Sequence, residues 1–221
     1  MLEKYEKVLK KSSSRVLELG EDVLRAYELG IEAFNSQDIG RANESRTILK
    51  DSHDRNNKID NEIIKTLALF SPEARDLRVV ISHLKIASEL TRMSDYIRSY
   101  AKSVKMQISG EFDLDVLKYD TLSFQTSTKK SLQAAVSSIK AENEEQLENL
   151  YRKVNVEDNK CDDMYSILEN SITEQMCSRP EETRDFITFM KSIRKLERIS
   201  DRSVNIVKLS YYAQKGGKLR L

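Results

Sequence analysis

Only two prolines interrupt this chain of 221 residues, Pro72 and Pro180, and they lie 108 residues apart. Six glycines and no tryptophan accompany them. Proline and glycine are the residues least tolerated inside an α-helix, so their scarcity favours long helices over many short strands. A serine stands directly before Pro72 and two residues before Pro180, and a glutamate follows each proline, which is a start signal for a helix. The sequence therefore predicts an all-α protein.

Apolar residues recur every three, four or seven positions along most of the chain, which is the spacing of one buried helical face. In the first stretch they are Val8, Leu9, Val16, Leu19, Val23, Leu24, Tyr27, Ile31 and Phe34. These stripes and the turn residues between them predict six helices, at about residues 2–35, 38–70, 72–108, 114–140, 144–176 and 180–214.

Three landmarks occur in the same order in both halves, which indicates an internal duplication. Each half contains one proline. Before it stands Lys58-Ile59-Asp60 in the first half and Lys160-Cys161-Asp162 in the second. After it stands Arg92-Met93-Ser94-Asp95 in the first half and Arg198-Ile199-Ser200-Asp201 in the second. The interval from proline to aspartate is 23 residues in the first half and 21 in the second, so we expect an irregular first turn in the last helix.

The duplication predicts two tandem antiparallel three-helix bundles, each built from helices of roughly 30 residues and about 45 Å. The first repeat covers residues 1–110 and the second residues 111–214. The basic, glycine-containing segment 215–221 is expected to be a flexible tail.

The charge of the chain is high but balanced, with 37 basic and 36 acidic residues. Bulk charge therefore gives no reason to expect binding to nucleic acid or to a membrane surface. No run of about 18 apolar residues occurs, and the first residues lack the apolar segment of a secretory signal. Cys161 and Cys177 are expected to be reduced thiols, as in a cytoplasmic protein.

Four carboxylates of the second half form two pairs with the same helical spacing. Asp158 and Asp162 are four residues apart on the fifth expected helix, and Glu197 and Asp201 are four apart on the sixth. Residues at this spacing point in the same direction, and both pairs border the apolar stripe of their helix. If these helices are antiparallel neighbours, the pairs converge into one site. Such a set of oxygen ligands suits Mg²⁺, Ca²⁺, Mn²⁺ or iron.

The first half retains only two of these four carboxylates, Asp60 and Asp95, with Asn56 and Thr91 in place of the others. Fewer charges hold a cation less tightly, so we expect the stronger site in the second half. His83 is expected to lie near the face that carries Asp95. A solvated or hydrogen-bonded histidine is favoured there over a metal ligand.

Neighbouring arginines offer a plainer explanation of the acidic pair in the last helix. Arg194 lies three residues before Glu197, and Arg198 lies three before Asp201. Two salt bridges at this spacing can neutralise a solvated helix face without any metal. A metal-free helical scaffold is therefore one alternative. A carboxylate-bridged metalloenzyme or metal store is another, although the sequence has no E-x-x-H pair, P-loop or hydrolase motif.

The last helix also carries a family resemblance. The segment Leu196-Glu197-Arg198-Ile199-Ser200-Asp201 resembles the signature L-E-R-I-G-D of the PhoU family, with serine in place of glycine. The segment Leu90-Thr91-Arg92-Met93-Ser94-Asp95 is a weaker copy. Residues 76–80 and 84–87 resemble the third helix of the family, and residues 58–60 resemble its second. The resemblance spans nearly the whole chain.

This resemblance implies a regulator and not an enzyme. PhoU proteins are accessory regulators of bacterial high-affinity phosphate transport, and they restrain phosphate uptake and the phosphate-starvation response. They contact the ATPase subunit of the phosphate ABC transporter and a membrane sensor histidine kinase, so membrane association is peripheral. Self-association into a homo-oligomer stays open.

The resemblance also implies metal cations held by E/D-x-x-x-D motifs on two helices of each repeat. Iron, manganese, magnesium and zinc are the candidate metals. The matching positions in the second repeat are Asp158, Asp162, Glu197 and Asp201, and the weaker set in the first repeat is Asp60 and Asp95.

Overall fold

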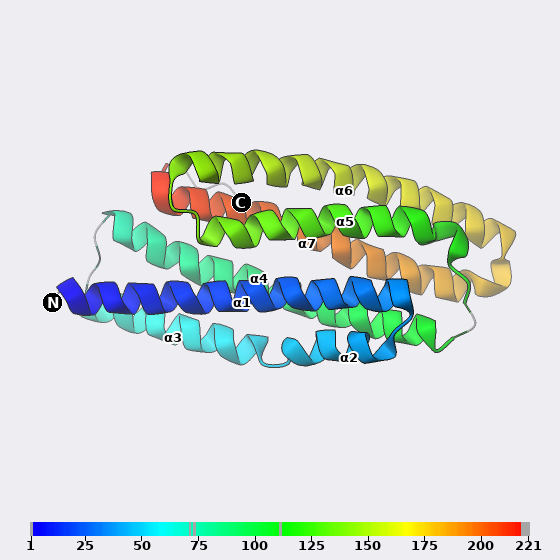
Figure 1. Cartoon of the computed structure of the whole chain (residues 1–221), viewed down its shortest axis with the longest axis horizontal. Helices are drawn as coiled ribbons and strands as arrows, with labels where there is room; N and C mark the ends of the chain where they lie inside the picture. Colours follow the sequence, from blue (N-terminus) through cyan, green and yellow to red (C-terminus); the bar gives the residue numbers. More distant parts are fainter. Residues whose placement is uncertain (1, 71, 73, 111, 218–221) are drawn as a thin grey trace.

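The computed structural model describes residues 2–70, 72, 74–110 and 112–217. Nearly all of these residues are helical, as Figure 1 shows, which confirms the expected fold class. The elements are α1 (Leu2–Ser36), α2 (Ile39–Ile48), α3 (Ser52–Phe70), α4 (Ala74–Ile108), α5 (Asp115–Ile139), α6 (Glu144–Ser178), the 3₁₀ turn η1 (Pro180–Glu182) and α7 (Thr183–Lys215).

The helices run roughly along the long axis of the molecule and form two layered bundles (Figure 1). Helices α1 to α4 make the first bundle, and α5 to α7 make the second. The bundles touch along α4 with α7 and along α1 with α5. Buried apolar residues of both bundles form one continuous core. For example, the rings of Phe34 and Phe189, from different bundles, stack with centroids 6.5 Å apart.

One expected helix is divided in two. We predicted a single helix over residues 38–70, whereas α2 ends at Ile48 and α3 begins at Ser52. The Thr47 hydroxyl donates to the carbonyl of Asn43 at 2.9 Å, a contact that bends helices. The Lys50 N–H then donates to the Thr47 carbonyl at 3.2 Å, which closes a tight turn. This break turns Leu49 into the core, where it is 1% exposed.

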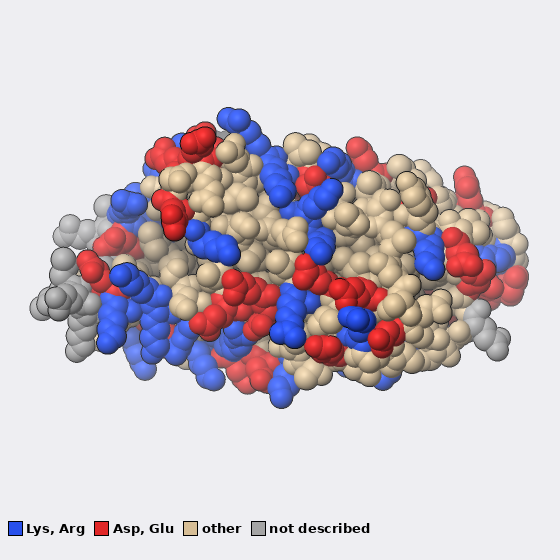
Figure 2. Space-filling model, viewed as in Figure 1, with Lys and Arg blue, Asp and Glu red and all other residues tan. Residues whose placement is uncertain are grey.

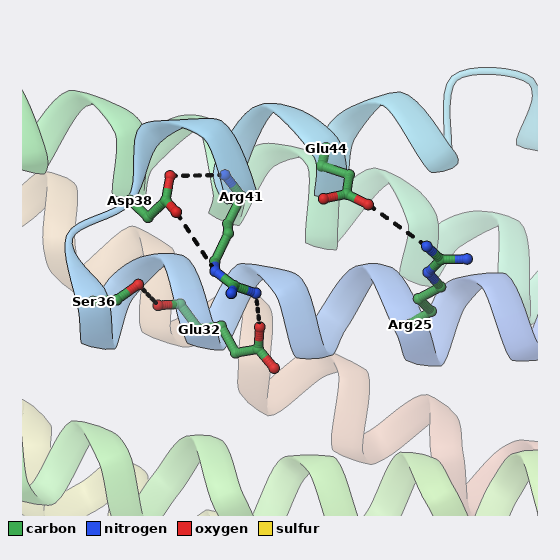
Figure 3. Close-up of polar contacts among 6 residues, drawn as sticks. All are labelled: Arg25, Glu32, Ser36, Asp38, Arg41 and Glu44. Atoms are coloured by element: carbon green, nitrogen blue, oxygen red, sulfur yellow. Dashed lines mark hydrogen bonds and ion pairs between the residues drawn. The ribbon is translucent and has the colours of Figure 1, made fainter.

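The corner between α1 and α2 is held by polar contacts (Figure 3). Asp38 caps α2, because its Oδ1 accepts from the Arg41 N–H at 3.2 Å. The guanidinium of Arg41 also contacts the carboxylates of Asp38 and Glu32. The Ser36 hydroxyl donates to the Glu32 carbonyl at 2.6 Å. These contacts fix the direction in which the chain leaves α1.

The ends of the helices in the second bundle follow local signals. Asn143 caps α6 at the predicted break, since its side chain accepts from the Gln146 N–H at 2.9 Å. Pro180 begins the 3₁₀ turn η1 before α7, where an irregular first turn was expected. In the first bundle α4 begins at Ala74, two residues later than predicted. Ser71 and Glu73, the serine and the acid of that start signal, lie outside the described residues.

The surface is charged in both signs, and acidic and basic side chains are interspersed over the face in Figure 2. None of the described helices combines the length and the hydropathy that crossing a membrane requires.

Candidate metal centre

Three of the four carboxylates predicted for the second repeat meet between α6 and α7. Asp162 comes from α6, and Glu197 and Asp201 come from α7, which packs against it. One carboxylate oxygen from each of the three lies within 4.8 Å of the other two. Such spacing allows one cation to contact all three side chains. The spacing of four residues in α7 and the antiparallel path of α6 produce this geometry.

Asp158 stands one turn before Asp162 on α6, outside this group of three. Burial raises the pKa of the Asp158 carboxyl, and the nearby charges of Asp162 and Asp201 raise it further, against a hydrogen bond from Ser200. The Oδ1 atom of Asp158 is buried without a hydrogen-bond partner. Asp158 therefore borders the group closely enough to be influenced by its charges.

The charges of this group are incompletely compensated. Burial raises the pKa of Asp162, and the charge of Asp201 adds to this effect. Burial also raises the pKa of Glu197, with a further rise from Asp201 and an opposing effect of Arg198 and Arg194. Each shift means that the charged form is less favourable here than in water. A bound cation would reverse this balance.

The predicted arginine pairs are present only in part. Arg198 lies 3.7 Å from Asp201, as its spacing predicted, and it also lies 3.5 Å from Glu197. Its side chain is 47% exposed, and both distances exceed those of charge-assisted hydrogen bonds. The Oε2 atom of Glu197 consequently remains buried without a hydrogen bond. Solvated arginine alone leaves this carboxylate unsatisfied, so the donor set fits a cation.

All ligand atoms of this group are carboxylate oxygens. Hard and intermediate cations such as Mg²⁺, Mn²⁺ and iron prefer such ligands, whereas zinc is more often bound by nitrogen and sulfur. The group contains no base or nucleophile besides the carboxylates themselves.

The first repeat gives each of its two carboxylates one partner from the protein, and the Oδ1 atom of Asp60 is buried without a hydrogen bond. The Asn56 amide donates to Asp60 at 3.1 Å. The Nε2 atom of His53 lies 3.0 Å and 3.1 Å from the two carboxylate oxygens of Asp95. The Thr91 hydroxyl donates to the carbonyl of Ala87 at 2.8 Å. Neither aspartate belongs to a group of three convergent metal-ligating side chains in the described part of the chain.

The expectation that His83 lies near the face of Asp95 is wrong. His83 is twelve residues before Asp95 on α4, which is about 18 Å along the helix axis. It lies instead in a cavity between the two bundles. The histidine beside Asp95 is His53, from the first turn of α3. His53, Asn56 and Asp60 share one helix face by their spacing of three and four, and this signal was available in the sequence.

The fold and the carboxylate group together define a duplicated helical-bundle protein with a candidate cation site in its second repeat. The family model described as PhoU domain matches residues 16–104 and 123–210. The chain therefore belongs to the PhoU family. Both matched segments fall inside the predicted repeats, whose own bounds stay a prediction.

Relatives and solved structures agree with this assignment. A phosphate-specific transport system accessory protein PhoU homolog from Clostridium acetobutylicum is 26% identical over 221 residues, which cover 98% of this chain and 97% of that protein. Crystal structures of PhoU from Pseudomonas aeruginosa and of the phosphate transport system regulatory protein PhoU from Streptococcus pneumoniae superpose with TM-scores of 0.86 and 0.84. Their sequence identities are 24% and 22%, and they cover 96% and 98% of this chain and 100% of each neighbour.

Proposed function

We propose that this chain is a cytoplasmic, non-catalytic regulator of phosphate uptake. It restrains the transporter when phosphate is plentiful and represses the phosphate-starvation response. Its partners are the ATPase subunit of a phosphate ABC transporter and a sensor histidine kinase. The observation that carries the proposal is family membership over both repeats, together with relatives that are accessory proteins of phosphate-specific transport systems.

The proposal includes a cation held in the second repeat by Asp162, Glu197 and Asp201, with Asp158 as a fourth ligand. The support is the convergence of three carboxylate oxygens within 4.8 Å from two helices. Buried oxygens of Asp158 and Glu197 without hydrogen-bond partners support it independently. The cation would neutralise these charges and join α6 to α7 at mid-length.

Phosphate uptake in a strain that lacks this gene tests the regulatory role. We expect uptake and a phosphate-starvation reporter to stay high in excess phosphate, and to return to normal when the wild-type gene is restored. The ATPase subunit should co-purify with the chain from cells grown in excess phosphate. Unchanged uptake and reporter activity in the deletion strain would overturn the regulatory proposal.

Metal content of protein purified without an affinity tag tests the cation site separately. We expect about one iron or manganese ion per chain in the wild type, and its loss in the double variant Asp162→Asn/Asp201→Asn. Asp163→Asn is the matched control, because Asp163 is an exposed neighbour outside the group. If the wild-type protein binds no metal at micromolar Mn²⁺ or Fe²⁺, the cation site is ruled out and the second repeat is a metal-free helical scaffold.

A further inference from the structure

Helices α4 and α7 pack against each other with opposite chain directions, and they join the first repeat to the second. The Nζ atom of Lys195 in α7 donates to the hydroxyl of Ser99 in α4 at 2.6 Å. Further along α7, Arg202 meets Glu89 and Tyr96, which precede Ser99 on α4. The residue one turn before Lys195 on α7 and the residue one turn after Ser99 on α4 therefore lie at the same level of the interface.

Lysines occupy both of these positions. Lys191 lies four residues before Lys195, and Lys102 lies three residues after Ser99. Residues at these spacings are neighbours on one helix face, with about 5–6 Å between their Cβ atoms. Lys102 and Lys191 are exposed, whereas Ser99 and Lys195 are half-buried. Lys102, Lys191 and Lys195, which we call the lysine cluster, thus lie around one serine hydroxyl and come from both repeats.

The positive charge of the lysine cluster has no counter-charge in the described part of the chain. No carboxylate there forms an ion pair with Lys102, Lys191 or Lys195. Burial lowers the pKa of Lys195, and the charge of Lys191 lowers it further. Like charges four residues apart destabilise a helix, so an anion bound between these lysines would relieve their repulsion.

Other basic residues along the interface do have acidic partners. Arg202 pairs with Glu89, and Arg198 lies 3.7 Å from Asp201. The carboxylate of Asp95, one turn before Ser99, contacts His53. The lysine cluster therefore differs from these neighbours in having its charge open to a ligand.

The hydroxyl of Ser99 has a proton to donate. Serines inside helices often donate to the carbonyl four residues earlier, as Ser94 and Ser103 do here. Ser99 instead accepts from Lys195, and its proton has no acceptor among the described residues. Lysine ammonium groups can only donate, so the cluster and the free hydroxyl proton together call for an acceptor of negative charge.

The composition of the cluster favours phosphoryl groups over carboxylates. Lysine is a compact point charge that binds phosphate oxygens, whereas the arginine fork matches a planar carboxylate. An anion with several charges can interact with all three lysines at once, and the Coulomb attraction increases with its charge. A chain of two or three phosphoryl groups meets both conditions.

We propose that the lysine cluster and the Ser99 hydroxyl bind an oligophosphate group, either of a free phosphate chain or of a nucleotide. The ligand contacts α4 of the first repeat and α7 of the second, so its binding stabilises the interface between them. Lys195 and Glu197 point to opposite sides of α7, because they are two residues apart. The site is therefore distinct from the candidate metal centre, and it requires neither the cation nor the transporter.

Isothermal titration calorimetry of the full chain tests the proposal. Tripolyphosphate binds divalent cations, so metal-free protein is titrated at pH 7.5 in the presence of EDTA. We expect one ligand per chain with a dissociation constant below about 100 μM, and at least about tenfold weaker binding of orthophosphate and of citrate. Tripolyphosphate that binds as tightly as ATP or more tightly identifies a free phosphate chain as the ligand, and tighter binding of ATP identifies a nucleotide.

Matched variants locate the site. Lys102→Gln, Lys191→Gln and Lys195→Gln should each weaken tripolyphosphate binding about three- to tenfold. Lys153→Gln removes the same charge from an exposed position of α6 and should bind like the wild type. The proposal is overturned if millimolar tripolyphosphate gives neither a saturable heat nor a rise in melting temperature. It is also overturned if citrate or an oligoglutamate peptide binds as tightly, or if Lys153→Gln weakens binding as much as the three cluster variants do.

Discussion

The guanidinium of Arg202 in α7 lies 2.5 Å from the carboxylate of Glu89 in α4, so an ion pair joins the two repeats. Each of the two side chains is only 16% exposed. Arg202 also donates to the hydroxyl of Tyr96 at 3.3 Å and lies over its ring. Arg202 directly follows Asp201, and Tyr96 directly follows Asp95. In each repeat, the residue after the second carboxylate of the motif therefore belongs to the interface.

Replacing Arg202 with methionine should destabilise the protein by about 2–3 kcal/mol, because Glu89 is left buried without its partner. Urea unfolding at pH 7.5 measures this difference. Glu89→Leu combined with Arg202→Met should recover much of the loss, since no charge then remains unpaired. Arg198→Met is the control at a 47% exposed position and should cost less than about 1 kcal/mol. Equal losses of stability in Arg202→Met and Arg198→Met would show that the buried ion pair contributes no more than an exposed one.

Removing one charge from the candidate metal centre should stabilise the protein when no metal is bound. In the presence of EDTA, Asp201→Asn should gain about 0.5 kcal/mol, because it relieves repulsion with Glu197 and Asp162. With added Mn²⁺ the order should reverse, since the wild type binds the ion and the variant loses a ligand. Thermal unfolding in both buffers tests this, with Glu174→Gln, at an exposed acid elsewhere on α6, as the control. If Asp201→Asn remains more stable than the wild type in Mn²⁺, the prediction of a cation site at Asp201 is wrong.

Most of the features that were predicted correctly from the sequence depend on local signals. Asp38 caps α2 and Asn143 caps α6 at breaks that the sequence predicted, because a cap depends on residues within one turn. The convergence of Asp162 with Glu197 and Asp201 required only that consecutive helices be antiparallel neighbours. The break before α3 escaped prediction because it depends on the burial of Leu49 against other helices.

The surroundings of the two histidines were not predicted from the sequence. His53 meets Asp95 because α3 packs against α4, and the break after α2 sets where the first turn of α3 lies. His83 lies in a cavity whose walls come from four helices of both repeats. The apolar stripe of a helix predicts which of its residues face the interior, but it does not predict which residues of other helices they contact there.

Burial of His83 should make stability depend on pH. Its pKa falls from 6.5 to about 4 on folding, so between these values the unfolded chain binds a proton that the folded chain excludes. The free energy of unfolding should therefore decrease as the pH falls through this window, by about 3 kcal/mol from this residue.

The comparison of variants isolates this contribution from that of the carboxylates, which titrate in the same range. His83→Gln should show a smaller loss of stability between pH 7 and pH 4.5 than the wild type does. His53→Gln, at the 61% exposed histidine, should retain most of the wild-type dependence. Identical pH profiles for the wild type and His83→Gln would show that His83 is accessible to protons in the folded state.

A buried polar contact across the two repeats should also be measurable. The amide of Gln125 in α5 donates to the hydroxyl of Tyr100 in α4 at 2.5 Å, and both residues are almost fully buried. Tyr100→Phe removes the acceptor and leaves the amide unpaired, which should cost about 1–2 kcal/mol in urea unfolding. Tyr119→Phe, at a tyrosine that is 78% exposed, should be neutral. A neutral Tyr100→Phe would mean that water replaces the lost partner.

The two cysteines should differ sharply in reactivity in the folded protein. Cys161 is fully buried beside the hydroxyl of Thr128, and burial raises its pKa to about 11. Cys177 is exposed near the end of α6. Because the thiolate is the reactive form, a disulfide reagent such as DTNB at pH 8 should modify Cys177 at least about 100-fold faster than Cys161.

Native protein should therefore release one equivalent of thionitrobenzoate rapidly, and protein in guanidinium chloride should release two. Cys177→Ser should remove the fast phase and leave the slow phase unchanged, since the substitution lies outside the core. The rate of the slow phase then reports how often the packing around Cys161 opens. A second fast equivalent in the native wild type would show that α6 separates from α5 far more readily than the buried contacts of Cys161 imply.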